Sequence, residues 1–248
     1  MSEKDVKNAG STISVVIPAY NEEKNISVCL DSLVKQSTTR KFEVIVVNNN
    51  SSDNTVKIAN EYNDKLNLRI IQENQKGRGA ARRAGFSVAK GSIILSTDTD
   101  ASVPANWIEK IMSAFEEEKE VSAITGTCKF TECSFFTNAV LNLFQPFSMR
   151  VYNIFFGHYW LSGFNFALRR ATYLEAGGFD SEFYSQEDVD LSFKVNKIGR
   201  IKFISDLCVI ESGRRFQKGL IRGVFPYIKT FISYFWFKRK DIYLDDQR

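Results

Sequence analysis

Two aspartates stand one residue apart at the end of an apolar run, in the stretch ILSTDTDAS at residues 94–102. Like charges this close repel each other unless solvent screens them or a cation lies between them. Carboxylate oxygens are the ligands that Mg²⁺ and Mn²⁺ prefer. Asp98 and Asp100 are therefore candidate ligands of a divalent cation. A solvated Asp-Thr-Asp turn is the structural alternative, and the residue types alone favour it.

A second acidic cluster, Glu187 and Asp188, opens a segment with helical spacing, and Asp190 follows it. A carboxylate within hydrogen-bond reach of a substrate hydroxyl can act as a general base and remove its proton. Acidic residues also favour the first turn of a helix, because they interact with the helix dipole. The local pattern alone favours this second use. Asp190 would point away from Asp188 on a helix, so we expect it to be structural.

The first hundred residues must supply the elements that position the Asp98–Asp100 pair. Short apolar runs alternate with segments of helical spacing, and the runs are at residues 13–17, 42–47, 68–71 and 92–97. Strands and helices in alternation predict βαβ units and a largely parallel sheet with helices on both faces. Strands that are covered on both faces are apolar throughout, as these runs are.

The sequence pattern changes after residue 100. A helix, a strand and an aromatic-rich helical segment are predicted at residues 104–120, 121–130 and 134–160. A helix from about residue 188 to 198 and two short strands at 201–204 and 207–211 follow. The second acidic cluster therefore lies at the start of a helix.

A polar cluster follows each of the four early strands. These clusters are at residues 18–23, 48–55, 73–85 and 98–100. In open α/β sheets, ligands bind beyond the carboxyl ends of the strands. Four polar clusters at one edge of one sheet therefore predict a lined crevice, with the DTD motif as part of its wall.

Taken together, these segments resemble the family 2 glycosyltransferases of the GT-A fold, from about residue 13 to 215. VVIPAYNEE is similar to that family's first strand and turn, VVNNNSSDNT to its second nucleotide-binding turn, and DTD to its DxD metal motif. SGFNFALRRATYLEAGGFD resembles the segment before its ED motif, and SQEDVDLSFKV resembles the motif itself. The resemblance implies a Rossmann-like α/β fold, a nucleoside-diphosphate-sugar donor, Mn²⁺ or Mg²⁺ as cofactor, and inversion at the transferred sugar.

The resemblance assigns one set of residues to the nucleotide sugar: Pro18, Ala19, Tyr20, Glu22, Asn48, Asn50, Lys76, Arg78, Asp98 and Thr99. Asn48 departs from the family pattern, which commonly has an aspartate there, and this leaves the identity of the base open. Lys76, Arg78 and Arg82 could meet the pyrophosphate or form a solvated basic helix face. Glu22 could contact a ribose hydroxyl or simply favour the start of a helix.

The resemblance also assigns the catalytic and metal-binding residues. Asp188 would be the general base, and Glu187 would orient the acceptor or the metal-bound phosphate. Asp98 and Asp100 would hold the cation, with Asp100 as the firmer ligand. Glu211, in a late strand, is a candidate third ligand.

Four further residues keep two readings each. His158, the single histidine, does not match the family's late metal-binding histidine, so we expect it to pack or to line the acceptor pocket. Arg214 and Arg215 could close over the diphosphate or neutralise anionic lipid. Gly163 could let the backbone approach a substrate closely, or it could form a plain turn.

The composition limits the class of protein. The chain has 248 residues, of which 44% are hydrophobic and 25% charged, which is typical of a globular protein with a large core. A net charge of +4 does not indicate nucleic acid, and we expect no such partner. The four cysteines have no CxxC spacing, so we expect free thiols in a reducing compartment. The polar first residues lack an apolar signal-peptide core, which favours a cytoplasmic protein.

Residues 216–248 differ in character from the predicted catalytic domain at residues 1–215. Apolar residues recur at helical spacing among aromatic rings and flanking basic residues. A basic, aromatic, amphipathic segment is typical of a helix in the membrane interface. We therefore expect peripheral binding at the cytoplasmic face of a membrane, and we hypothesise a lipid-linked or glycan acceptor. A helix docked on the catalytic core and a dimer contact are the alternatives.

Two other functions stay open at this stage. A nucleotidyltransferase shares a Rossmann-like sheet and a divalent metal, but it usually has a basic Gly-rich loop after the first strand, where this chain has the acidic PAYNEE. A non-catalytic sugar-binding module at a membrane would not need intact DTD and QED clusters. We therefore favour a metal-dependent, inverting glycosyltransferase.

Overall fold

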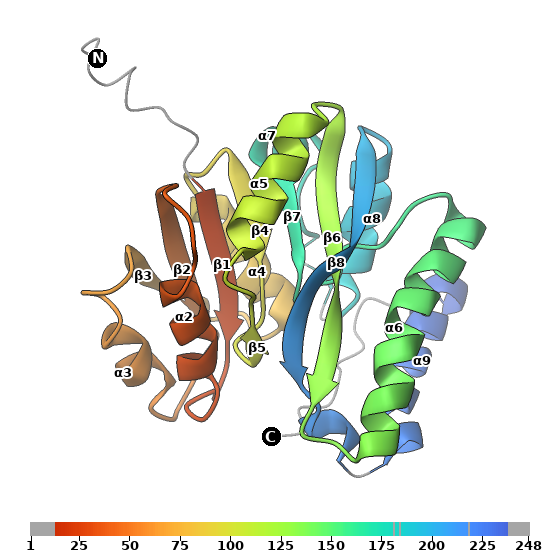
Figure 1. Cartoon of the computed structure of the whole chain (residues 1–248), viewed down its shortest axis with the longest axis horizontal. Helices are drawn as coiled ribbons and strands as arrows, with labels where there is room; N and C mark the ends of the chain where they lie inside the picture. Colours follow the sequence, from red (N-terminus) through yellow and green to blue (C-terminus); the bar gives the residue numbers. More distant parts are fainter. Residues whose placement is uncertain (1–12, 181, 184, 218, 238–248) are drawn as a thin grey trace.

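The computed structural model describes residues 13–180, 182–183, 185–217 and 219–237. Within these residues one eight-stranded sheet forms the centre, in the order β3-β2-β1-β4-β7-β6-β8-β5, and helices cover both of its faces (Figure 1). The prediction of an α/β fold with a mostly parallel sheet between helices is confirmed.

Four parallel strands form the first half of the sheet, as the alternating pattern predicts. They are β1 (Ile13–Ala19), β2 (Phe42–Asn48), β3 (Leu68–Gln72) and β4 (Ile93–Ser96). The helices that connect them are α2 (Ile26–Val34), α3 (Thr55–Asn60) and α4 (Arg78–Val88). Because these strands are parallel, their carboxyl ends meet at one edge, and the turns that follow them gather there.

The second half of the sheet mixes strand directions. Its strands are β5 (Ala101–Ser102), β6 (Val121–Thr131), β7 (Phe166–Arg169) and β8 (Arg200–Ser212), and α5 (Trp107–Glu117) precedes β6. β7 is antiparallel to both β4 and β6, whereas β8 is parallel to β6 and antiparallel to β5. The two short strands predicted at 201–204 and 207–211 are one strand, because β8 bulges between Phe203 and Cys208 and then continues along β6.

Two apolar clusters pack against opposite faces of the sheet. One joins the sheet to α2 and α5, where Leu30 and Trp107 are fully buried. The other joins it to α4 and α8 (Glu187–Asn196), where Phe86 and Leu191 are buried. Burying side chains of this size contributes roughly 1.5–3 kcal/mol each. Both clusters therefore hold the strand ends, which carry the polar turns, in fixed positions.

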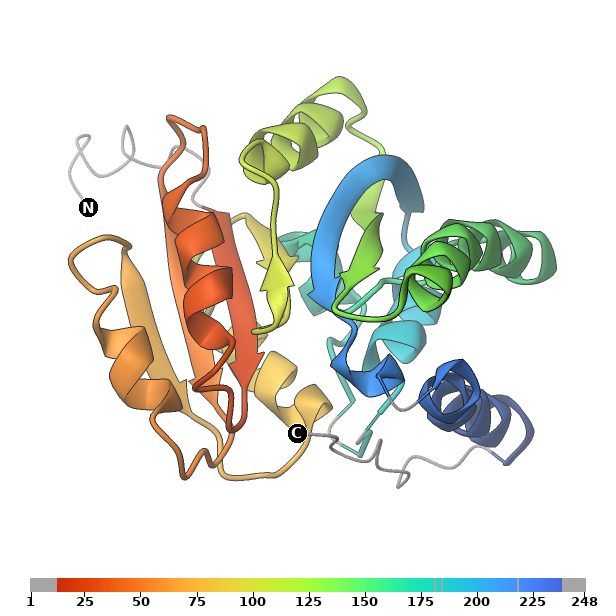
Figure 2. The same ribbon diagram turned by 60° about the horizontal axis from the view of Figure 1, so that its bottom comes forward.

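Two long helices flank the β6–β8 side of the sheet. α6 (Phe135–Phe156) and α9 (Leu220–Phe237) lie side by side there (Figure 1, Figure 2). The ring of Phe156 in α6 stacks on that of Phe235 in α9, with 4.9 Å between centroids. Phe193 of α8 contacts the same Phe235 ring at 5.9 Å. The amphipathic helix predicted in the tail therefore forms, and one of its faces is docked on α6 and α8.

Short elements join these parts. α7 (Arg170–Glu175) follows β7, and the 3₁₀ turn η1 (Arg214–Phe216) joins β8 to α9. Residues 238–248 of the predicted extension lie outside the described residues. No helix in the described part of the chain has both the length and the apolar character that crossing a bilayer requires.

Candidate active site

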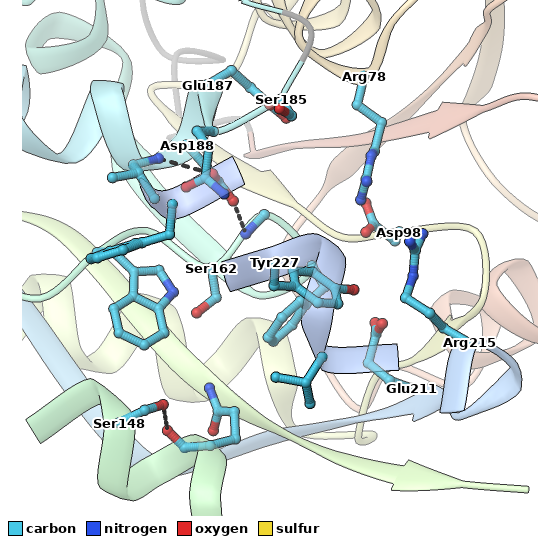
Figure 3. A pocket seen from close by; sticks show the side chains of 18 of the residues that line it. Arg78, Asp98, Ser148, Ser162, Ser185, Glu187, Asp188, Glu211, Arg215 and Tyr227 are labelled. Carbon is cyan, nitrogen blue, oxygen red and sulfur yellow. Dashed lines mark hydrogen bonds between the residues drawn. The ribbon is translucent and has the colours of Figure 1, made fainter. Parts of the chain in front are cut away.

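A cavity of about 1280 Å³ lies at the carboxyl ends of β1 and β4 and reaches α6 and α9. Most of the site residues expected from the sequence line it: Pro18, Ala19, Tyr20, Glu22, Arg78, Asp98, Thr99, Asp100, Glu187, Asp188 and Glu211. Figure 3 shows Asp98 and Glu211 at one side of the cavity and Glu187 and Asp188 at the other. The fold thus brings both acidic clusters of the sequence to one space.

Asp98, Asp100 and Glu211 form a group that we name the carboxylate cluster. One oxygen from each side chain lies within 4.8 Å of the other two. Strand pairing explains the arrangement, because β5 directly follows Asp100 and pairs antiparallel with β8, so that Ala101 lies opposite Glu211. The sheet itself therefore places the third candidate ligand beside the DTD motif.

The carboxylate cluster fits a hard divalent cation. Oε1 of Glu211 is buried and has no hydrogen-bond partner among the described residues, and such an atom is costly unless a ligand pairs with it. Burial raises the pKa of Asp100 to about 6; Arg214 opposes the rise, and Asp98 adds to it. Burial, and then the charges of Asp100 and Asp98, raise the pKa of Glu211 well above its usual value. The raised pKa values mean that these carboxyl groups do not ionise easily while they are crowded together without a cation. Mg²⁺ or Mn²⁺ would stabilise their ionised form, and both ions prefer oxygen ligands.

Arg214 adds positive charge beside the carboxylate cluster. It begins η1, and its Nη2 lies 2.9 Å from Oδ2 of Asp100 and 2.7 Å from Oε1 of Glu22. Nη1 donates to the other carboxylate oxygen of Glu22 at 3.0 Å. Glu22, which is buried, is thus paired with a cation from the other end of the domain. A diphosphate bound at the cluster would lie close to this guanidinium.

Arg82 joins the two acidic clusters. Its side chain is 2% exposed, its Nη2 donates to Oδ1 of Asp98 at 2.6 Å, and its Nη1 forms an ion pair with Glu187. Two carboxylates of the protein are therefore its partners in this structure, in place of the pyrophosphate or solvent expected from the sequence. Gly163 makes room for this ion pair, because a Cβ at that position would collide with the Arg82 guanidinium.

Asp188 lies at the cavity wall at the start of α8. Its Oδ2 accepts a hydrogen bond from the N–H of Gly163 at 2.9 Å. Burial, together with repulsion from Glu187, raises the pKa of Asp188 to about 6, while Arg82 opposes the rise. A carboxylate with a raised pKa accepts a proton more readily near neutral pH than an ordinary aspartate does. The position and basicity of Asp188 suit a general base.

The backbone directly before this acid pair is strained, and α9 holds it. Gln186 has a φ of 64°, in the left-handed region, which costs a non-glycine residue about 1–3 kcal/mol. Its side-chain amide donates to Oγ1 of Thr230 in α9 at 3.0 Å. Tyr234, also in α9, donates to Asp190 at 3.3 Å, and Asp190 pairs with Lys194, which supports its structural role. The C-terminal helix therefore helps to position the segment that carries the acid pair.

Three residues that the resemblance assigned to the nucleotide do not line the cavity. The amide of Asn48 donates to Gln72 of β3 at 2.7 Å, Asn50 bonds backbone carbonyls of the turn after β3, and Lys76 is exposed. Asn49 lines the cavity instead. β2 ends at Asn48, and Asn49 and Asn50 lie in the turn that follows, where the regular alternation of a strand no longer tells which side chain faces inward. That pattern is the reason why sequence reasoning missed Asn49.

His158 packs inside the protein. Its Nε2 lies 3.2 Å from Oγ of Ser192, and its ring meets the ring of Phe193 at 4.6 Å between centroids. It is buried and is not part of the cavity wall. Burial lowers the pKa of His158, so the ring is neutral near pH 7. Of its two expected roles, packing is the one that the structure shows.

A family model described as Glycosyl transferase family 2 matches residues 14–176, which is more than half of the chain. The chain belongs to glycosyltransferase family 2. The residues matched to family 2 include the DTD motif, whereas Glu187, Asp188 and Glu211 lie beyond them. The roles of those three residues therefore rest on the geometry of the cavity.

Curated proteins similar to this family 2 chain are also glycosyltransferases. The probable glycosyltransferase YdaM of Bacillus subtilis is 27% identical over an alignment of 253 positions that covers 94% of this chain and 60% of that protein. Glycosyltransferase AglE of Haloferax volcanii is 36% identical over 123 residues, 48% of this chain and 40% of that protein. The family 2 chain thus spans less than two thirds of the length of these relatives. Membership of family 2 favours a glycosyltransferase over the nucleotidyltransferase alternative.

Solved structures share the fold of this family 2 chain. TarS of Staphylococcus aureus, in complex with UDP-GlcNAc, matches with a TM-score of 0.65 at 24% identity, over 81% of this chain and 58% of that chain. The mannosyltransferase PcManGT of Pyrobaculum calidifontis, in complex with GDP-Man and Mn²⁺, matches with a TM-score of 0.63 at 21% identity, over 88% of this chain and 64% of that chain. These likenesses confirm the predicted GT-A fold.

Proposed function

We propose that this family 2 chain transfers a sugar from a nucleoside diphosphate to an acceptor hydroxyl, with a divalent cation and with inversion at the sugar carbon. The observation that carries the proposal is a single cavity that holds both the carboxylate cluster and Asp188. A donor site and a general base in one cavity can bring the two substrates into contact. TarS and PcManGT, which share the fold, are bound to nucleotide sugars in their structures, and this supports the choice of donor.

The residues at the end of β1 and the carboxylate cluster would hold the donor. Pro18, Ala19 and Tyr20 line the cavity beside the cluster and would contact the base and ribose. Asp98, Asp100 and Glu211 would hold Mn²⁺ or Mg²⁺, which when bound neutralises the negative charge of the leaving diphosphate. Arg78 and Arg214 also line the cavity and would hydrogen-bond the phosphate oxygens, since guanidinium pairs well with phosphate.

Asp188 would take the proton of the acceptor hydroxyl. Its neighbour Glu187 is engaged by Arg82, so it is not placed to attack the sugar as a nucleophile. Asp188 would thus accept a proton, and no second carboxylate would attack the sugar. This arrangement supports direct attack of the acceptor hydroxyl on the anomeric carbon, a single displacement that inverts its configuration.

The stereochemistry of donor hydrolysis tests the proposal without a known acceptor. Water can take the place of the acceptor beside Asp188, so the chain should slowly hydrolyse at least one α-linked donor among UDP-glucose, UDP-GlcNAc and GDP-mannose. We expect this hydrolysis to need Mn²⁺ or Mg²⁺ and to release the β-anomer first, as seen by proton NMR before mutarotation. Release of the α-anomer, equal rates in EDTA, or no turnover of any donor would contradict the proposal.

We also propose that the acceptor is lipid-linked and that the chain binds peripherally to the cytoplasmic face of a membrane. Large apolar side chains are exposed on α6 and α9: Phe135, Phe136, Leu143, Phe144, Phe147, Ile154, Phe155, Ile221, Phe225, Ile228, Ile232 and Trp236. Two adjacent helices with this many exposed apolar residues resemble interfacial helices. Arg222 and Lys229 on α9 are exposed as well, and a basic residue near anionic lipid contributes about 1 kcal/mol.

Flotation tests the membrane proposal. The full chain should float with vesicles of phosphatidylethanolamine and phosphatidylglycerol in a density gradient, and more weakly at high salt, because salt screens the basic residues. A chain that stays at the bottom of the gradient with these vesicles would contradict the proposal.

The four free cysteines are consistent with a reducing compartment such as the cytoplasm.

A further inference from the structure

The cavity continues from the catalytic acids into a groove between α6 and α9. We name this part the apolar groove; its walls are Phe147, Val151 and Phe155 of α6 and Val224, Ile228 and Phe231 of α9. Asp188 and Trp160 line the same cavity. The two helices that form the walls lie next to each other, away from the parallel half of the sheet (Figure 2). The general base and the apolar groove therefore share one continuous space.

The apolar groove is open to water along its outer side. Phe155 is 77% exposed and Ile228 is 50% exposed, although both line the cavity. Trp236, at the last turn of α9, also lines the cavity and is 75% exposed. Apolar surface of this extent is unfavourable in water and commonly marks a binding site. We therefore expect the groove to bind an apolar molecule that enters from its outer side and covers these exposed side chains.

Gln145 of α6 places an unsatisfied polar side chain in the same cavity. Both the amide nitrogen and the amide oxygen of Gln145 in α6 are shielded from solvent and lack a hydrogen-bond partner among the described residues. Gln145 also lines the cavity. A buried amide without partners costs free energy unless a ligand satisfies it. Gln145 can both donate and accept, so it suits a ligand with a polar head as well as an apolar chain.

These observations distinguish among possible occupants. A protein helix or a second copy of this chain would cover the exposed side chains from outside, but it would not use the connection between the groove and Asp188. A hydrocarbon chain needs no hydrogen-bond partner along its length, so it can lie between the apolar side chains of the two helices. If the molecule that Asp188 deprotonates carries such a chain, one ligand fills both parts of the cavity.

We propose that the apolar groove binds the hydrocarbon chain of the lipid that carries the acceptor, with the polar head of the lipid at Gln145 and the reactive hydroxyl at Asp188. This inference rests on the proposed function, because it assumes that Asp188 acts on an acceptor. It adds a defined chain-binding site, in which α9 forms one wall while it also holds Gln186 beside the catalytic acids.

Binding of farnesyl phosphate, used below its micelle concentration, tests the site. The full chain should bind farnesyl phosphate in isothermal titration and should bind inorganic phosphate much more weakly, because only the first has an apolar chain. Val224→Trp fills the groove and should weaken farnesyl phosphate binding at least about tenfold, the loss expected when about two methylene groups no longer contact a wall. Ile221→Trp is the matched control, since Ile221 lies in the same helix, is 83% exposed and does not line the cavity.

Further measurements keep the test decisive. Val151→Trp narrows the groove from α6 and should act like Val224→Trp; circular dichroism shows whether each variant is folded. Equal binding to wild type and to both groove variants, or no binding to wild type, would overturn the inference. A dimer seen in sedimentation that Val224→Trp dissociates and Ile221→Trp does not, in a chain that fails to bind farnesyl phosphate, would mean that the groove binds a second copy. That result would also overturn the inference. Mn²⁺-dependent donor hydrolysis separates the two proposals: if the wild-type chain hydrolyses a donor but does not bind farnesyl phosphate, only this inference is wrong.

Discussion

Asp188→Asn is expected to lower sugar transfer by about 10²–10⁴-fold, the contribution typical of a general base. The asparagine amide has nearly the same shape and can still accept a hydrogen bond from the N–H of Gly163, but it cannot take a proton. Donor binding should be nearly unchanged, because Asp188 lies apart from the carboxylate cluster in the cavity (Figure 3). Initial rates of transfer or of donor hydrolysis, together with titration of the donor, measure both effects.

The pH dependence of the wild-type protein gives a second view of the same residue. Burial raises the pKa of Asp188 to about 6, as it does that of Asp100 without a cation, and both the base and the metal ligand work only when they are ionised. The value of kcat/KM should therefore fall as the pH drops below about 6, where the carboxylate becomes protonated. Asp190→Asn is the matched control, since Asp190 lies in the same helix and pairs with Lys194. Activity of Asp188→Asn close to that of wild type would remove this residue from the mechanism.

Arg82→Met is expected to lower the free energy of unfolding by about 3–5 kcal/mol, the cost of breaking a buried ion pair by removing one partner. Methionine keeps the apolar stem but leaves the carboxylate of Glu187, which is buried, and that of Asp98 without their shared cation. Urea unfolding followed by circular dichroism measures the change. A large loss is expected even without donor or metal, because the ion pairs exist in the protein by itself.

Arg83→Met supplies the comparison for this loss. Arg83 is the next residue of α4, and its Nη2 donates to the exposed side chain of Gln75 at 3.0 Å. Removing a partly exposed side chain of this kind should cost at most about 0.5–1 kcal/mol. Equal losses for the two variants would show that the Arg82 network does not stabilise the fold.

The parallel half of the sheet and the DTD motif were predictable because local patterns determine them. β1, β2, β3 and β4 are short apolar runs with helices between them, and parallel strands necessarily gather their carboxyl ends at one edge. Glu211 was reached only through resemblance. Its place beside Asp100 depends on the pairing of β5 with β8, a contact between segments far apart in the chain.

The role of Arg82 could not be predicted, because α4 has few large apolar residues. The helix packs on β1 and β2 through small residues instead, and Gly85 faces Val16 and Val47 so closely that a Cβ would collide with them. A helix that packs through small residues shows no apolar stripe, so its pattern does not reveal which arginine is buried. The ion pairs of Arg82 with Asp98 and Glu187 become visible only in three dimensions.

The tail shows a different limit of sequence reasoning. An amphipathic, aromatic helix was predicted there, and α9 forms, but its pattern favoured a membrane only slightly over a protein surface. In the structure one face of α9 packs on α6 and α8, and other side chains, such as Ile221 and Trp236, stay exposed. A single helix can therefore be docked on the core and still present an apolar surface to a membrane.

The central claim is that the carboxylate cluster holds a divalent cation together with the diphosphate of a sugar donor. Anomalous diffraction from crystals soaked with Mn²⁺ and a nucleoside-diphosphate sugar tests it most directly. We predict one strong manganese peak between Asp98, Asp100 and Glu211, in contact with the diphosphate, and a much weaker peak or none in Asp100→Asn crystals. A donor bound in the cavity with no manganese at these three side chains would contradict the claim.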